Sequence, residues 1–175
     1  QDELIRKMTG RKLSFERSAG GSTGAKALLS TDNLCLKHPQ VVGAQRLRNI
    51  SFSLHTGEIL GLYGLMGAGR SELLESIFGL HPRHASGEIL VNGKAKIIKS
   101  PEQAIEAGIA LVPEDRKLQG LFLEQAVKTN ISITVLQTLE RWGGIMLNNK
   151  KEKNLAQDFI NSLSIKTASD QTAVK

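Results

Sequence analysis

The chain has 175 residues, of which 40% are hydrophobic, so it is long enough for one globular domain with its own core. The aromatic residues are five Phe, one Tyr and one Trp, which makes that core mainly aliphatic. A single cysteine excludes an internal disulfide framework and suits a reducing compartment. No apolar run approaches the roughly 18 residues that span a bilayer, so we expect neither a transmembrane helix nor a signal peptide in this sequence.

The formal net charge of +6 raises the possibility of nucleic-acid binding. The densest basic group is Lys150, Lys151 and Lys153, and it lacks the interleaved aromatic residues that stack on bases. We interpret these lysines as the solvated face of a helix and expect no nucleic-acid partner. The net positive charge could instead steer the protein toward an anionic ligand or a membrane surface.

The first 26 residues differ in composition from the rest of the chain. Leu4, Ile5 and Met8 share one face of a predicted helix over 2–8. Residues 17–26 are rich in Gly and Ser, a composition typical of a flexible linker. The chain starts with Gln1 rather than Met, which suggests a piece of a longer protein. We therefore expect a boundary near residue 26, with the end of a preceding domain before it.

Three strands are predicted next. Residues 27–36 form the first, and the alternating apolar residues at 50, 52 and 54 indicate a second with one buried face. A turn at Thr56-Gly57 leads into a mostly apolar run over 58–63, which is typical of a buried strand.

A glycine-rich loop at 64–71, Gly-Leu-Met-Gly-Ala-Gly-Arg-Ser, follows the third strand. It matches the phosphate-binding loop pattern except that Arg70 occupies the lysine position. In that pattern the glycines turn backbone N–H groups toward a phosphate, and the next helix adds the positive end of its dipole. The lysine reaches the β- and γ-phosphates, and the Ser or Thr hydroxyl coordinates magnesium. Arginine keeps the positive charge but replaces a compact ammonium with a planar fork.

A helix and a hairpin are predicted after the loop. Leu73, Leu74, Ile77 and Phe78 recur at helical spacing, and Gly79 is placed to end the helix. The runs 88–91 and 94–98 flank Asn92-Gly93, which indicates a hairpin because both turn residues tolerate positive φ. We expect an antiparallel sheet packed beside the strand that feeds the loop.

The second half of the chain is predicted to be mainly helical. Ser100, Pro101 and Gln103 combine three helix-start signals, and Gly108 ends that helix after Ala107. A short strand at 109–112 then precedes the polar segment 113–117, where open α/β sheets collect ligand groups. Further helices are predicted over 127–139 and 151–163.

Taken in order, these blocks resemble an ATP-binding cassette. The blocks that carry the resemblance are 57–71, 86–89, 100–103 and 112–117. They are most similar to the second cassette of double-cassette ATPase subunits of bacterial monosaccharide importers, whose phosphate loop typically reads Gly-Leu-Met-Gly-Ala-Gly-Arg. The resemblance covers residues 30–175, and 2–11 resemble the closing helix of a first cassette. It implies an α/β phosphate-loop NTPase core with an antiparallel β subdomain and part of a helical subdomain. It also implies that 1–25 are the end of a preceding cassette and a linker, and that 26–175 are a truncated nucleotide-binding domain.

The resemblance also implies ATP and Mg²⁺ as ligands of named residues. The expected nucleotide-binding residues are Gly64, Gly67, Ala68, Gly69, Arg70, Ser71 and Glu114, with Ser71 and Glu114 also at the metal. Glu114 falls where cassettes place a glutamine that contacts magnesium and the attacking water, and a carboxylate can still ligate a hard cation. The alternative is that Glu114 is an acidic surface residue in a charged loop.

This sequence departs from the cassette pattern in two ways. Cassettes commonly stack adenine on an aromatic residue between the first two strands, but residues 37–46 contain no Phe, Tyr or Trp. His38 either substitutes for that aromatic residue or is a solvated loop residue. The family catalyses hydrolysis with an Asp that binds magnesium, a following Glu that acts as the base, a switch His and a signature sequence. None of these appears by Lys175. The resemblance therefore implies no catalytic residue here and no ATP hydrolysis by this piece alone.

Two functions stay open. In the first, the chain is part of an ATPase subunit that powers import of a monosaccharide through ATP binding and hydrolysis. In the second, it is a degenerate cassette that binds nucleotide weakly or not at all and serves dimerisation and docking. Both imply a peripheral subunit on the cytoplasmic face of the bacterial inner membrane. Its implied partners are integral-membrane permease subunits, a second cassette and, indirectly, a periplasmic sugar-binding protein.

Overall fold

The computed structural model describes residues 26–141 and 146–174. These residues belong to two compact units that divide between Leu111 and Val112. The helix predicted over 2–8 and the linker predicted over 17–26, except for its last residue, lie outside the described residues. The domain boundary expected near residue 26 stays a prediction.

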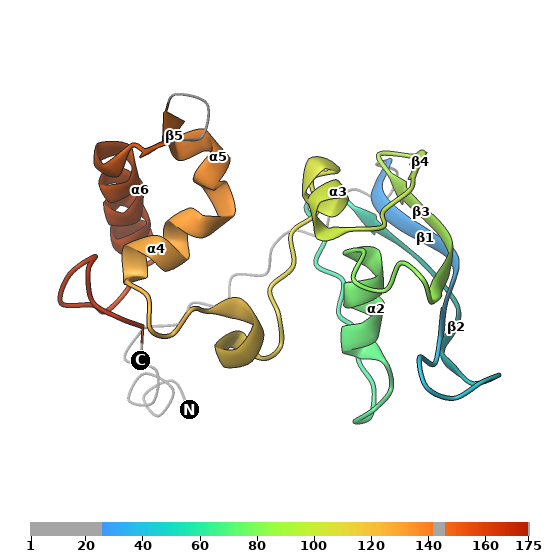
Figure 1. Ribbon diagram of the computed structural model, residues 1–175. Helices are drawn as coiled ribbons and strands as arrows, with labels where there is room; N and C mark the ends of the chain where they lie inside the picture. The colour runs from blue at the N-terminus through green and yellow to red at the C-terminus, as the bar shows by residue number, and fades with distance from the viewer. Residues whose placement is uncertain (1–25, 142–145, 175) are drawn as a thin grey trace, which may run out of the picture. The chain divides into compact units, whose positions relative to one another are not determined.

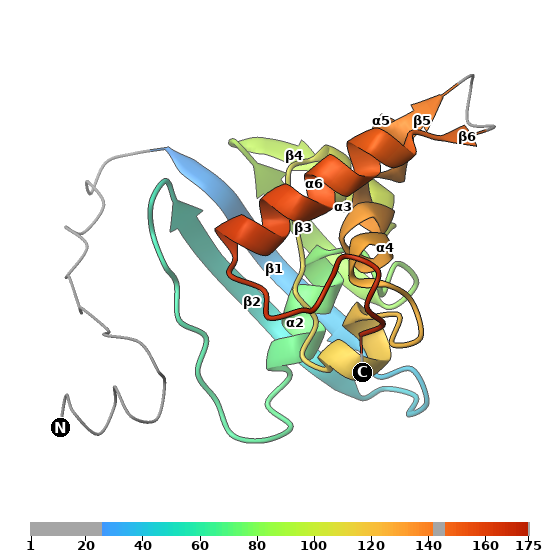
Figure 2. The same cartoon turned by 90° about the vertical axis from the view of Figure 1, so that its left-hand side faces the viewer.

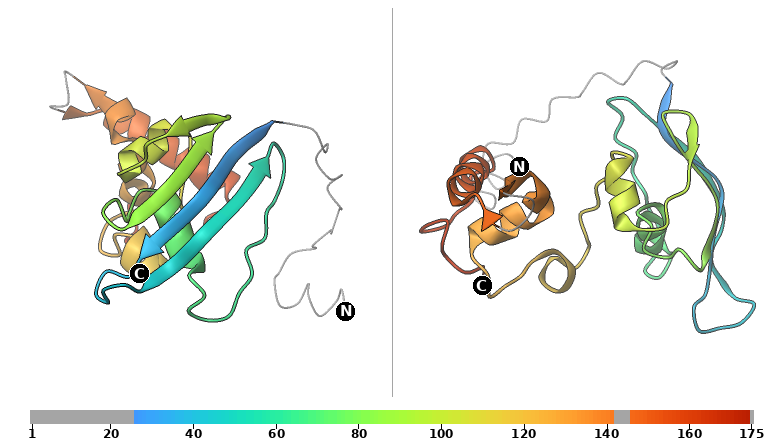
Figure 3. Two further views of the ribbon diagram at one scale, coloured as in Figure 1. Left: turned by 90° about the vertical axis from the view of Figure 1, so that its right-hand side faces the viewer. Right: turned by 45° about the horizontal axis from the view of Figure 1, so that its top comes forward.

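An antiparallel sheet forms one side of the first unit (Figures 1 and 3). Its strands are β1 (Ala27–Lys37), β2 (Gln45–His55), β3 (Ala85–Val91) and β4 (Lys94–Lys96), in the order β2-β1-β3-β4. The turn between β3 and β4 falls at the predicted position, where Asn92 and Gly93 have φ values of 53° and 73°. The predicted antiparallel sheet and its hairpin are therefore confirmed.

Two helices, α2 (Arg70–Ile77) and α3 (Pro101–Glu106), cover one face of this sheet (Figure 3, right). The core between them is aliphatic, as composition predicts, and consists of Leu34, Leu36, Leu47, Leu73, Ile77, Ile89 and Val91. The predicted start of α3 is confirmed, because Ser100 Oγ accepts from the Gln103 N–H at 3.4 Å. The Gln103 side chain reaches back and accepts from the Lys99 N–H at 2.8 Å.

The strands predicted over 58–63 and 109–112 are not present in the described residues. Figure 2 shows the segment from β2 to α2 as a connection without a strand. Its apolar side chains lie open, with Ile59 94% and Tyr63 99% exposed, and Val112 is 90% exposed. A central parallel strand needs hydrogen-bonded neighbours and cover on both faces. None of the described strands pairs with either run, so the apolar pattern alone does not produce a strand.

The second unit is mainly helical. In chain order it contains the π-helix η1 (Arg116–Gly120), α4 (Val127–Ser132), the 3-10 turn η2 (Ile133–Val135), α5 (Leu136–Leu139), β5 (Glu140–Arg141), β6 (Met146–Leu147) and α6 (Asn149–Ser162). The helix predicted over 127–139 is thus interrupted by η2, and the one predicted over 151–163 begins two residues earlier. No helix in the described part of the chain has the length and apolar character that crossing a bilayer requires.

Candidate phosphate-binding site

The loop over 64–71 leads directly into α2 with the backbone geometry of an anion site. Gly67 and Gly69 have φ values of 80° and 85°, which glycine adopts without strain. Gly69 is the N-cap of α2, and its carbonyl accepts the first helical hydrogen bond from the Leu73 N–H at 2.9 Å. No side chain caps this end of the helix. The first amides of α2 and the positive end of its dipole are therefore directed at the loop.

Close packing explains two of the predicted glycines. A Cβ on Gly69 would lie 2.8 Å from Leu47 Cδ2 and 3.3 Å from the Arg46 carbonyl oxygen, so the end of the loop lies against β2. A Cβ on Gly64 would lie 3.0 Å from the Cβ of Ala68. The loop is thus closed on itself and on β2, and the structure brings the residues predicted at 64–71 together.

Arg70 and Ser71 are the two side chains predicted to meet the phosphates and the metal. The Arg70 stem folds back over the loop, with Cδ 3.8 Å and Cγ 3.9 Å from the position of a Cβ on Gly64. Arg70 is exposed, and among the described residues no carboxylate forms an ion pair with it. Ser71 is half-buried at the second position of α2. Arg70 therefore keeps its charge available for an anion at the loop.

Arg46 and Glu72 form an ion pair beside the loop that sequence reasoning missed. Arg46 Nη1 on β2 donates to Glu72 Oε1 in the first turn of α2. A hydrogen bond from its own backbone N–H, and then Arg46, lower the pKa of Glu72, while burial opposes the shift. The two residues are 26 positions apart, so no local pattern pairs them; only the packing of α2 on β2 does.

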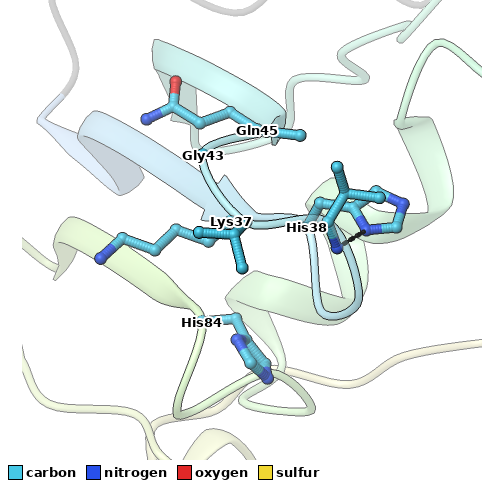
Figure 4. A pocket seen from close by; sticks show the side chains of 8 residues that line it. Lys37, His38, Gly43, Gln45 and His84 are labelled. Carbon is cyan, nitrogen blue, oxygen red and sulfur yellow. Dashed lines mark hydrogen bonds between the residues drawn. The ribbon is translucent and has the colours of Figure 1, made fainter.

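A cavity of about 380 Å³ opens at the turn between β1 and β2 (Figure 4). Lys37, His38, Gln45 and His84 supply its polar lining, and Val41 and Val42 supply apolar surface. His38 Nδ1 accepts hydrogen bonds from the N–H groups of Gln40 at 3.1 Å and Val41 at 3.0 Å. The His38 ring is thus held by its own turn. Residues 37–46, where the resemblance expects an adenine-stacking aromatic residue, contain no Phe, Tyr or Trp.

Glu114 lies in the second unit, whereas the loop lies in the first. It is exposed, and it precedes η1, whose start is fixed by Asp115 Oδ1 accepting from the N–H groups of Lys117 and Leu118, both at 3.0 Å. Its role at a metal stays a prediction. Within the described ranges no three His, Cys, Asp or Glu side chains form a metal-binding group. Mg²⁺ prefers oxygen ligands, and the side chains of Ser71 and Glu114 each carry oxygen.

Comparison with known proteins identifies the family. The sequence profile described as ABC transporter matches residues 47–175. The chain belongs to the ABC transporter family. The ribose import ATP-binding protein of Clostridium tetani is 42% identical over 175 residues, which are 100% of this chain and 33% of that protein. The xylose import ATP-binding protein of Yersinia pseudotuberculosis is 35% identical, over 99% of this chain and 34% of that protein. This ABC chain therefore spans about a third of the length of these curated relatives.

Solved ABC proteins share the fold. A nucleotide-free ATP-binding cassette from an ABC transporter superimposes with a TM-score of 0.61 at 21% identity, covering 85% of this chain and 58% of that one. A bacterial Atm1-family ABC exporter with ATP bound gives a TM-score of 0.55 at 17% identity, covering 98% of this chain and 28% of that one. The expected cassette fold, with its antiparallel β subdomain, is confirmed for this ABC chain.

Proposed function

We propose that the chain is part of a nucleotide-binding domain that binds Mg-ATP at 64–71 and helps to power monosaccharide import. The observation that carries the proposal is the start of α2, which no side chain caps and which follows two glycines with left-handed backbone angles, in a chain of the ABC family. The sugar-import part rests on the names of the relatives, which are ribose and xylose import ATP-binding proteins.

The backbone and the side chains of the loop have distinct tasks in this proposal. The amides that follow Gly67 would hold phosphate oxygens, and Arg70 would supply positive charge where cassettes use lysine. The Ser71 hydroxyl would hold magnesium, with Glu114 as a second oxygen ligand. When bound, the metal neutralises charge on the β- and γ-phosphates. ATP hydrolysis is proposed for the whole subunit, in which further catalytic groups complete the site.

The test is a calorimetric titration of the chain with Mg-ATP, with Arg70→Lys measured beside it. Saturable binding by the natural chain is the expected result, because the loop geometry and the charge of Arg70 are both present. Absence of binding by both proteins would overturn the proposal for this chain. A reversed-charge control, Arg70→Glu, should abolish binding while the melting temperature stays unchanged, since the side chain is exposed.

The second candidate function is a degenerate cassette that contributes dimerisation and docking rather than nucleotide binding. It is favoured by Arg70, which stands where cassettes have lysine, and by the β1–β2 turn, which has no Phe, Tyr or Trp to stack on adenine. His38, which lines the cavity at this turn, accepts hydrogen bonds from backbone N–H groups of the turn itself. Binding by Arg70→Lys but not by the natural chain would support this candidate. The two functions therefore give opposite results in one titration.

Both candidates place the protein at the cytoplasmic face of the inner membrane, against permease subunits and a second cassette. A sugar-binding protein would act indirectly through the permease. We propose the segment 114–137 as the docking region. Crosslinks from Lys117→Cys to a permease subunit in the assembled transporter are expected, whereas Ser53→Cys on the exposed part of β2 serves as the control. Equal crosslinking from both positions would contradict this docking region.

A further inference from the structure

Glu72 places a negative charge in the first turn of the helix proposed to receive phosphates. A carboxylate there is attracted by the helix dipole, but it also repels a bound phosphate at the same end. Ser71, the proposed metal ligand, is its immediate neighbour in the sequence. An uncompensated Glu72 would therefore weaken the site that α2 provides.

Arg46 supplies that compensation from β2. Its Nη1 donates to Glu72 Oε1, and the side chains are 41% and 24% exposed. The ion pair stands beside the loop, because the Arg46 carbonyl oxygen is only 3.3 Å from the position of a Cβ on Gly69. Arg46 thus combines the right charge with a place at the start of α2.

We propose that Arg46 is a positioning residue for nucleotide binding, which neutralises Glu72 so that the start of α2 and Arg70 present a net positive field to the phosphates. This inference rests on the function proposed above and adds a residue outside the loop to it. Glu72 then remains at the helix start, where it suits the dipole, without repelling the ligand.

A contribution to the stability of the fold does not explain why Arg46 and Glu72 form an ion pair here. Ion pairs with this degree of exposure contribute little to stability, and β2 and α2 are already joined through the aliphatic core. A triphosphate carries several negative charges, so one uncompensated carboxylate nearby is expected to weaken binding by roughly threefold to tenfold at low salt.

A double-mutant cycle tests the proposal by calorimetric titration with Mg-ATP at low and high salt. Arg46→Gln should weaken binding by roughly threefold to tenfold, and high salt should reduce that loss. Glu72→Gln should bind as well as the natural protein or more tightly. The double variant should return to within about twofold of the natural protein, since neither charge remains. Arg48→Gln, which removes an exposed arginine without a described ion pair on the same strand, is the matched control and should change affinity by less than about twofold.

Two results of the cycle would overturn the proposal. One is unchanged affinity in Arg46→Gln, and the other is an equal loss from Arg46→Gln with and without Glu72→Gln, which would mean that Arg46 acts independently of Glu72. If Arg46→Gln lowers the melting temperature, Arg46→Lys keeps the charge and should keep the affinity; a tenfold loss there would also contradict the inference. Failure of the natural protein to bind Mg-ATP overturns the proposed function itself, whereas binding with a flat cycle overturns only this inference.

Discussion

Ser132 and Glu152 meet in the interior of the second unit, where Ser132 Oγ donates to Glu152 Oε1 at 2.8 Å. Ser132 is 1% and Glu152 5% exposed, and Lys128 Nζ donates to the other carboxylate oxygen at 3.2 Å. A buried carboxylate is tolerated when hydrogen bonds and an opposite charge replace its water. These three side chains therefore fix how α4 lies on α6.

Lys128→Met should lower the free energy of unfolding by about 1–3 kcal/mol, because it leaves the Glu152 carboxylate buried without its cation. Urea denaturation followed by circular dichroism measures the change. Adding Glu152→Leu should recover much of the loss, since an apolar pair removes the unpaired charge. Lys150→Met on the exposed start of α6 is the control and should change stability by less than about 0.5 kcal/mol.

Gly87 on β3 lies so close to the backbone of β1 that a residue with a side chain does not fit there. Its φ is 109°, and a Cβ there would lie 2.5 Å from the Asn33 carbonyl oxygen and 2.7 Å from Leu34 Cα. Gly87→Ala should therefore destabilise the protein by more than the roughly 1–2 kcal/mol that a left-handed alanine costs. Gly57→Ala isolates that conformational cost, because its φ is 74° but nothing lies within 4 Å. Thermal denaturation of both variants measures the difference; equal losses would contradict the close-contact explanation.

Local signals in the sequence predicted the local features of the fold. Asn92-Gly93 predicted the hairpin because few residues tolerate its backbone angles, and Ser100 with Gln103 predicted the start of α3 because capping is a short-range interaction. The pattern of the loop over 64–71 could be found for the same reason, since all of its positions lie within eight consecutive residues.

Features that depend on distant partners were not predictable in the same way. The apolar run over 58–63 has the composition of a buried strand, but a strand forms only where neighbours supply its hydrogen bonds. The ion pair of Arg46 with Glu72 and the buried contact of Ser132 with Glu152 likewise join residues 26 and 20 positions apart. Packing creates both contacts, so the sequence pattern carries no signal for either.

The Glu72 carboxylate should make stability depend on pH in a defined direction. Its pKa in the folded protein is lowered from an ordinary 4.5 by its own backbone N–H and by Arg46. The ionised form is therefore favoured in the folded state, and its stabilising contribution is present above about pH 4.5 and is lost as pH falls below that value. The difference in free energy of unfolding between the natural protein and Glu72→Gln should be constant from neutral pH to pH 5.5 and shrink in acid. A difference that grows in acid would contradict this assignment.

Ser71→Ala should separate magnesium binding from phosphate binding. The hydroxyl is the proposed metal ligand, whereas the loop amides and Arg70 would hold phosphate without it. Affinity for Mg-ATP should fall by roughly tenfold or more, while affinity for ATP with a chelator present should change by less than about twofold. Ser71→Thr retains the hydroxyl and should restore the effect of magnesium. Equal losses with and without magnesium would place Ser71 among the phosphate contacts and remove its role at the metal.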